Sequence, residues 1–260
     1  MNGILHVETT GTGPPLILLH GWAMHSGVWG TLAAQLAQRF RVHAVDLPGH
    51  GRSAPAASYA LDALTRSIAT RFGDERETLT LLGWSLGGLL ALRWASLQPG
   101  RIARLVLVGS TPCFVTRDDW PHAMAAGTLA RFGDELRVAY RLTLLRFLSL
   151  QLQGSDDGRA VLARLRRNLF ERGDPAPAAL AAGLGLLAAT DLRPEVPFVA
   201  CPALVVAGER DTLVPPAAAA WLANALPRAR LVPLAGAGHV PFLSHPAAFR
   251  AAVDGFLDER

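Results

Sequence analysis

Short apolar runs alternate with longer stretches of helical periodicity along most of the chain. The runs are too short for helices and mostly apolar, which is typical of strands in a parallel sheet, and run 202–208 is expected to be buried. They cover residues 15–19, 41–45, 79–82, 102–108, 202–208 and 229–234. A sheet of this kind has crossover helices between its strands and binds ligands at the carboxyl ends of the strands. Functional residues are therefore expected in the segments that follow the runs.

The strand pattern is missing between about residues 113 and 192, where arginine-rich helical periodicity replaces it. We interpret this segment as a helical cap inserted into an α/β fold. The predicted domains are a core of residues 1–112 and 193–260 and a cap of residues 113–192. A chain of 260 residues, half of them apolar, can bury such a core as one domain.

The sequence Gly83-Trp84-Ser85-Leu86-Gly87 follows the run 79–82 and precedes a helical stretch. A strand that turns sharply into a helix forces the central residue into a strained conformation and brings backbone segments very close, so glycine is needed on both sides. This G-x-S-x-G pattern predicts a serine hydrolase with Ser85 as the nucleophile at a helix N-terminus.

A serine nucleophile needs a histidine base that a buried carboxylate orients. Asp211 follows the run 202–208, and His239 lies in a glycine-rich loop after the run 229–234. The order Ser, Asp, His matches that of α/β hydrolases. Glu209 is the rival acid, but it is closer to the strand and its neighbour Arg210 suits a surface pair. We therefore predict Asp211 as the acid and His239 as the base.

Two backbone N–H groups are expected to bind the oxyanion of the tetrahedral intermediate. One belongs to Leu86, which follows the nucleophile, and the other to Trp22, which follows His20-Gly21 after the run 15–19. The Trp22 indole is expected either to line the acyl site or to pack in the core.

The remaining features exclude several kinds of site. Cys113 and Cys201 are far apart in the sequence and are expected to be free thiols, and no cluster has metal-ligand spacing, so neither a metal nor a cofactor is expected. No apolar run is long enough to span a membrane, and the start of the chain lacks a signal-peptide core, so we predict a cytoplasmic protein. A monomer is expected, although the sequence does not determine the oligomeric state. The net charge of +4 comes entirely from arginine and is not taken as a nucleic-acid signal.

These motifs together resemble the α/β-hydrolase superfamily from end to end. Within it, the chain is similar to the pimeloyl-(acyl-carrier protein) methyl ester esterases of biotin synthesis. The segments that carry this closer resemblance are Leu18–Trp22, Gly83–Gly88, Phe147–Gln151 and His239–Pro246.

The resemblance implies further site residues. Substrate contacts would come from Trp22, Ser85, Leu86, Phe147, Leu148, Ser149, Leu150, Gln151 and His239. Cap arginines would dock an acyl-carrier protein. Arg146 and Arg159 align with arginines of the family, whereas Arg141 and Arg164 are one place out of register. Core packing is the alternative role for Phe147, Leu148 and Leu150.

Charge supports carrier docking independently of the alignment. Residues 131–172 hold nine arginines against five acidic residues. Since carrier proteins are acidic, a basic rim above Ser85 would attract and orient them. The alternative is a solvated arginine face opposite the apolar helix face of Leu162, Leu165 and Leu169.

The implied reaction is hydrolysis of the methyl ester of pimeloyl-acyl-carrier protein. Other chemistries on the same fold stay open at this point: a short-chain carboxylesterase acting on small esters, an enol-lactonase, a carbon–carbon bond hydrolase, a peptidase, or a ligand-binding receptor that keeps the triad.

Overall fold

The computed structural model describes residues 5–153, 155–156 and 158–259. Residues 1–4, which belong to the segment without a signal-peptide core, lie outside the described residues. Asp157 of the cap also lies outside them. The strands are β1 (Val7–Thr10), β2 (Pro15–Leu19), β3 (Arg41–Val45), β4 (Leu79–Trp84), β5 (Ile102–Val108), β6 (Ala203–Gly208) and β7 (Ala229–Leu234). They form one sheet in the order β1-β3-β2-β4-β5-β6-β7, in which only the β1–β3 pairing is antiparallel.

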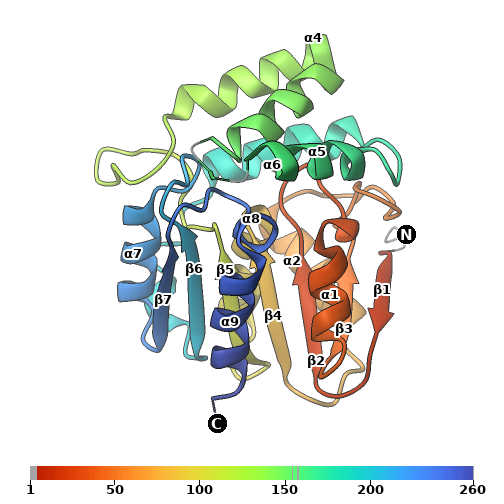
Figure 1. Ribbon diagram of the computed structural model, residues 1–260, viewed down its shortest axis with the longest axis vertical. Helices are drawn as coiled ribbons and strands as arrows, with labels where there is room; N and C mark the ends of the chain where they lie inside the picture. Colours follow the sequence, from red (N-terminus) through yellow and green to blue (C-terminus); the bar gives the residue numbers. More distant parts are fainter. Residues whose placement is uncertain (1–4, 154, 157, 260) are drawn as a thin grey trace.

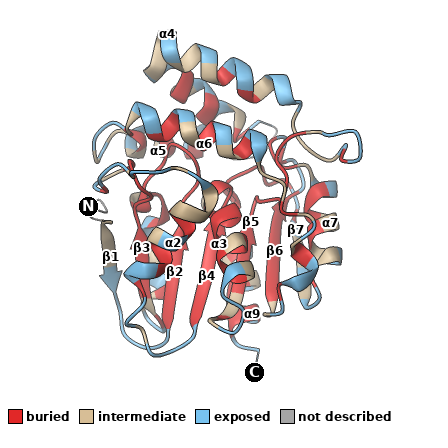
Figure 2. Cartoon of the chain, turned by 180° about the vertical axis from the view of Figure 1, so that it is seen from behind, coloured by how far each residue is buried: buried red, intermediate tan, exposed pale blue. Residues whose placement is uncertain are grey.

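Helices cover both faces of the sheet. They are α1 (Gly30–Leu36), α2 (Leu61–Arg71), α3 (Leu86–Leu97), α4 (Ala126–Leu150), α5 (Gly158–Leu169), α6 (Pro177–Ala189), α7 (Pro216–Ala225), α8 (Pro241–Ser244) and α9 (Pro246–Leu257), with 3₁₀ turns η1 (Ser26–Trp29) and η2 (Val196–Phe198). Helices α1 and α9 lie on one face, and α2 and α3 lie on the other (Figures 1 and 2). The predicted α/β-hydrolase fold, with a mainly parallel sheet flanked by helices, is confirmed.

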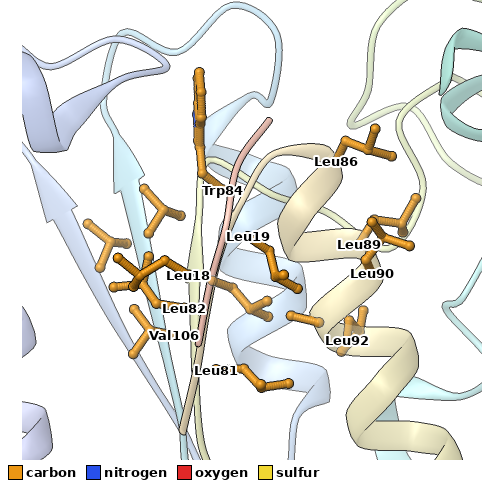
Figure 3. Packing of buried hydrophobic residues seen from close by; sticks show 14 of the residues in the cluster. Leu18, Leu19, Leu81, Leu82, Trp84, Leu86, Leu89, Leu90, Leu92 and Val106 are labelled. Atoms are coloured by element: carbon orange, nitrogen blue, oxygen red, sulfur yellow. The ribbon is translucent and has the colours of Figure 1, made fainter. Parts of the chain in front are cut away.

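The central strands are buried on both faces, as their uniform apolar runs predict. Every residue of β2, β4 and β6 is buried. In Figure 3, Leu82 and Val106 of neighbouring strands lie on one side of the sheet, and Leu19 and Leu81 lie on the other side, toward the leucines of α3. Removal of this apolar surface from water is the main stabilising contribution to the core.

Between β5 and β6 the chain leaves the sheet and forms α4, α5 and α6. These three helices lie over the carboxyl ends of the parallel strands (Figure 1). The long helix α4 is kinked at Ala139, whose φ and ψ of −141° and 56° are not helical. Its outer face is exposed, while Leu144, Phe147 and Leu148 on the inner face join the common core (Figure 2). The cap is therefore packed onto the carboxyl edge rather than held there by its two linkers alone.

The first strand was not expected. Residues 7–10 read Val-Glu-Thr-Thr, which is too short and polar to stand out as a buried run. Since β1 lies at the edge of the sheet and pairs only with β3, it needs no apolar face on both sides.

Candidate active site

Ser85 occupies a sharp turn between β4 and α3. Its φ of 54° and ψ of −118° lie where side chains rarely go, so the strained backbone expected of a nucleophile elbow is present. A Cβ on Gly87 would come within 2.1 Å of the Leu19 carbonyl oxygen, and one on Gly83 within 2.4 Å of the Gly87 oxygen. Only glycine fits at these two positions. The turn places Ser85 at the N-terminus of α3, where the helix dipole favours negative charge.

Asp211 and His239 are hydrogen-bonded to each other at the ends of β6 and β7. The separation of His239 Nδ1 and Asp211 Oδ2 is 2.8 Å, and both side chains are buried. Because a carboxylate only accepts, Nδ1 carries the proton and Nε2 is left as the basic nitrogen. The Asp211 Oδ1 accepts the N–H groups of Leu213 and Val214 at 2.9 Å each. Glu209, the rival acid, is exposed at the surface.

His239 lies next to the elbow through the residue that precedes the serine. The Trp84 indole Nε1–H donates to the His239 carbonyl at 2.9 Å, and the two rings are 5.8 Å apart. The described residues show no hydrogen bond from the Ser85 hydroxyl to the His239 ring. In free enzymes such bonds are commonly long and shorten when substrate binds.

The oxyanion loop after β2 is held by His20. Its Nδ1–H donates to the Gly21 carbonyl at 2.8 Å, and its Nε2 accepts the Leu47 N–H at 2.9 Å. Burial lowers the pKa of His20 to about 3, so the ring is neutral and keeps both bonds at working pH. Within the described part of the chain, the backbone N–H groups of Trp22 and Leu86 donate to no other residue, which leaves both available to an oxyanion.

The Trp22 side chain is part of the contact between core and cap. Its Nε1–H donates to the Leu180 carbonyl of α6 at 2.9 Å, and its ring meets Phe147 of α4 edge to face at 4.7 Å. A Cβ on Gly183 would come within 2.6 Å of the indole. The indole is therefore buried between two cap helices, which accords with the packing alternative, whereas its backbone N–H stays free.

The five residues of the expected acyl channel do not share one environment. Phe147, Leu148 and Gln151 are buried, and the Gln151 carbonyl accepts the backbone N–H of His239 at 2.9 Å. The Gln151 Oε1 is buried without a hydrogen-bond partner among the described residues. Ser149 is exposed, and it lines an outer hollow of α4 together with the half-buried Leu150. The helical period accounts for this division, because positions 147, 148 and 151 face inward together.

The four arginines expected to dock the carrier protein also differ. Arg146 pairs with Glu135 at 3.1 Å and Arg141 with Asp174 at 3.0 Å. Arg159 is exposed and Arg164 is half-buried beside Gly30, and neither forms an ion pair with another described residue.

Asp46 is a residue whose role the sequence did not reveal. It is fully buried after β3 and accepts the backbone N–H groups of Ser26 and Arg52 at 2.6 and 2.9 Å. Burial raises its pKa, but these bonds and nearby His20 outweigh that effect and lower it. The cap residue Arg172 donates to Ser26 Oγ at 2.7 Å and lies 3.7 Å from Asp46. The sequence feature that could have indicated this role is the position of Asp46, directly after a predicted strand and at the start of a glycine-rich segment.

Both cysteines are free thiols, as expected. No three His, Cys, Asp or Glu side chains in the described part of the chain gather as a possible metal site. Within residues 5–153, 155–156 and 158–259, no helix is long and apolar enough to cross a lipid bilayer.

Fold and elbow together define an α/β hydrolase. Residues 14–246 match the protein family described as alpha/beta hydrolase fold. The esterase from Exiguobacterium antarcticum superimposes with a TM-score of 0.91 at 24% identity, covering 99% of this chain and 96% of that one.

Two relatives are similar over nearly their whole length. A pimeloyl-(acyl-carrier protein) methyl ester esterase of Nitrosomonas europaea is 49% identical, with 96% of this chain and 98% of that protein covered. One of Nitrosospira multiformis is 43% identical, with 97% of each covered. The chain belongs to the α/β-hydrolase family and, within it, to the group of these esterases. The resemblance stated from the sequence is confirmed.

Proposed function

We propose that this protein is a serine carboxylesterase that hydrolyses the methyl ester of pimeloyl-acyl-carrier protein, releasing pimeloyl-acyl-carrier protein and methanol in biotin synthesis. The observation that carries the proposal is the buried His239–Asp211 pair beside the strained Ser85, in a chain 49% identical to an esterase of that name. Similarity to known esterases supports the substrate, and the geometry of the site supports the hydrolytic chemistry.

The reaction proceeds in two halves. Ser85 Oγ attacks the ester carbonyl while His239 Nε2 takes its proton, and the N–H groups of Trp22 and Leu86 bind the resulting oxyanion. Collapse of the intermediate expels methanol, which receives the proton from His239. Water then attacks the acyl-enzyme with His239 again as base, and the free acid leaves. Asp211 stays ionised throughout, accepts the hydrogen bond from His239 Nδ1–H and holds the imidazole in the productive tautomer.

The cap supplies the recognition in this proposal. Phe147, Leu148 and Gln151 face the core beside Trp22 and His239, where an acyl chain attached to Ser85 would lie. Arg146 and Arg159, on the outer side, would meet an acidic carrier protein, with Arg141 and Arg164 as secondary contacts. A monomer in the cytoplasm is the state in which we expect the protein to meet its carrier.

The experiment compares the carrier-bound methyl ester with p-nitrophenyl acetate, a small ester that needs no docking. Ser85→Ala is expected to abolish turnover of both with the fold intact, as judged by circular dichroism. The double variant Arg146→Glu/Arg159→Glu is expected to lower kcat/KM on the carrier-bound ester by about tenfold or more and to leave the small ester unaffected.

A matched control carries the same charge change at the opposite end of the sheet. Arg76 and Arg228 are exposed and lie just before β4 and β7, on the amino side. Arg76→Glu/Arg228→Glu is expected to leave both rates unchanged. Equal losses in the two double variants, or equal rates on both esters in the wild type, would contradict docking on the cap; substantial turnover by Ser85→Ala would contradict the mechanism.

A further inference from the structure

Trp84 belongs to one of the three chain segments that the reaction brings together and contacts the other two. It is the last residue of β4 and directly precedes Ser85, and its side chain is only 1% exposed. In Figure 3 its indole points away from the leucines of the sheet, beyond the end of the strand. The indole is part of the common core, but it packs beyond the end of β4.

The first contact joins the elbow to the base. The indole Nε1–H donates to the His239 carbonyl at 2.9 Å, while the His239 N–H donates to the Gln151 carbonyl at 2.9 Å. The backbone of His239 is thus fixed on both sides, and its ring is fixed by Asp211. Among the described residues, the His239 carbonyl has no other donor, so removing the indole N–H leaves a buried acceptor without a partner.

The second contact joins the elbow to the oxyanion loop. A Cβ on Gly21 would lie 3.0–3.2 Å from three atoms of the Trp84 ring, closer than ordinary van der Waals contact. The backbone that leads to the Trp22 N–H therefore rests on the face of the indole. Phe242, with its ring centre 5.2 Å away, and Trp29, at 6.5 Å, support the same indole.

We propose that Trp84 is a positioning residue that fixes the spacing between the Ser85 elbow, the His239 loop and the Gly21–Trp22 oxyanion loop. It does so with one hydrogen bond and one ring face, and it touches no reacting atom in this role. The inference goes beyond the proposed function, because it concerns every ester that Ser85 attacks. Small displacements of catalytic groups, of about 1 Å, can lower rates 10²-fold.

The first test uses Trp84→Phe, which removes the N–H and keeps an aromatic ring. The matched control is Trp94→Phe in α3, since Trp94 is equally buried at 1% exposure and its Nε1–H donates to Gln98 Oε1 at 2.8 Å. Both variants lose an indole and its hydrogen bond, which is buried at Trp84 and partly buried at Trp94, so both melting temperatures are expected to fall.

The kinetic parameters on p-nitrophenyl acetate separate the two variants. We expect Trp84→Phe to lower kcat about tenfold or more with KM changed less than threefold, and to slow phosphonylation of Ser85 by a fluorophosphonate in proportion. Trp94→Phe should keep kcat within twofold. A Trp84→Phe enzyme with kcat within twofold of wild type, or a Trp94→Phe enzyme that loses as much, would overturn the proposal.

A double-mutant cycle tests the contact with the oxyanion loop. Gly21→Ala should lower kcat strongly in the wild-type background, because the added methyl group presses on the indole. In the Trp84→Phe background the smaller ring leaves room, so the same change should cost several-fold less. Equal losses of kcat in the two backgrounds would contradict the part of the proposal that concerns the contact between Gly21 and Trp84.

Discussion

At the carboxyl edge of the sheet, backbone atoms meet backbone atoms, whereas on the outer face of the cap charged side chains meet one another and water. A Cβ on Gly87 would lie 2.1 Å from the Leu19 carbonyl, but one on Gly185 of α6 would meet nothing within 4 Å. The Asp211 side chain is fully buried, while Arg137 of α4 is 78% exposed although it pairs with Asp134.

The difference separates two kinds of requirement. Close approaches of backbone fix the edge to within a few tenths of an ångström, as catalysis needs. Exposed ion pairs contribute about 0–1 kcal/mol each and leave a surface free to change its charge pattern. The edge is thus suited to the chemistry and the cap face to recognition, and substitutions in the two regions should differ in kind as well as in size.

The largest expected effect is on the acid of the edge. Asp211→Asn should lower kcat on p-nitrophenyl acetate by about 10³–10⁴-fold, because an amide can stabilise the wrong histidine tautomer and cannot stabilise the imidazolium. Glu209→Gln, two residues away and exposed, should leave kcat within twofold. Steady-state kinetics of both variants decide between the two acids, and a reversed result would transfer the role to Glu209.

A glycine substitution in each region comes next. Gly87→Ala should lower the free energy of unfolding by about 3 kcal/mol or more, since the backbone of β2 blocks the new methyl group. Gly185→Ala, inside α6 with open space around it, should raise that free energy by about 0.5–1 kcal/mol. Urea unfolding curves measure both. A Gly87→Ala protein as stable as wild type would show that the close approach is not required.

Arg172 tests whether a largely buried arginine of the cap contributes to stability as residues of the carboxyl edge do. Its side chain is 14% exposed, bonded to Ser26 Oγ and to Glu8 Oε2 at 2.8 Å. Arg172→Met should cost about 2 kcal/mol of unfolding free energy, because a hydrogen bond to the carboxylate of Glu8 is lost and Ser26 and Asp46 stay buried without the guanidinium. Arg137→Met should change it by less than about 0.5 kcal/mol. If urea unfolding gives similar losses of free energy for Arg172→Met and Arg137→Met, buried and exposed arginines of the cap do not differ and the prediction is wrong.

Between pH 6.5 and 4 the edge should respond to acid through its buried histidines, whereas arginine keeps its charge. Burial lowers the pKa of His50 from 6.5 to about 4. Between these values the unfolded chain binds a proton that the folded one does not, so stability falls as the pH falls from 6.5 to 4. His50→Gln should flatten that dependence by up to about 1.4 kcal/mol per pH unit, measured by urea unfolding across the range. If the stability of His50→Gln falls as steeply with decreasing pH as that of the wild type, this prediction is wrong.

Local motifs account for what the sequence made predictable. The six mostly apolar runs all appear as strands. The G-x-S-x-G motif can be recognised from the local sequence, although the distant Leu19 carbonyl is what makes glycine necessary at position 87. The polar strand β1 was missed, because an edge strand lacks a buried run. The roles of Trp84 and Arg172 were missed for another reason, since each depends on partners more than 100 residues away in the chain. The inward positions of Phe147, Leu148 and Gln151 were available from helical periodicity.

The bond from His239 N–H to the Gln151 carbonyl has a consequence for protein engineering. Grafting the lid of another hydrolase onto this scaffold would replace the last turn of α4, and with it the acceptor that holds the backbone of the imidazole-bearing loop. A chimera that alters selectivity without loss of turnover must therefore keep a backbone carbonyl in the position of the Gln151 oxygen, which requires the path of the last α4 turn to be preserved.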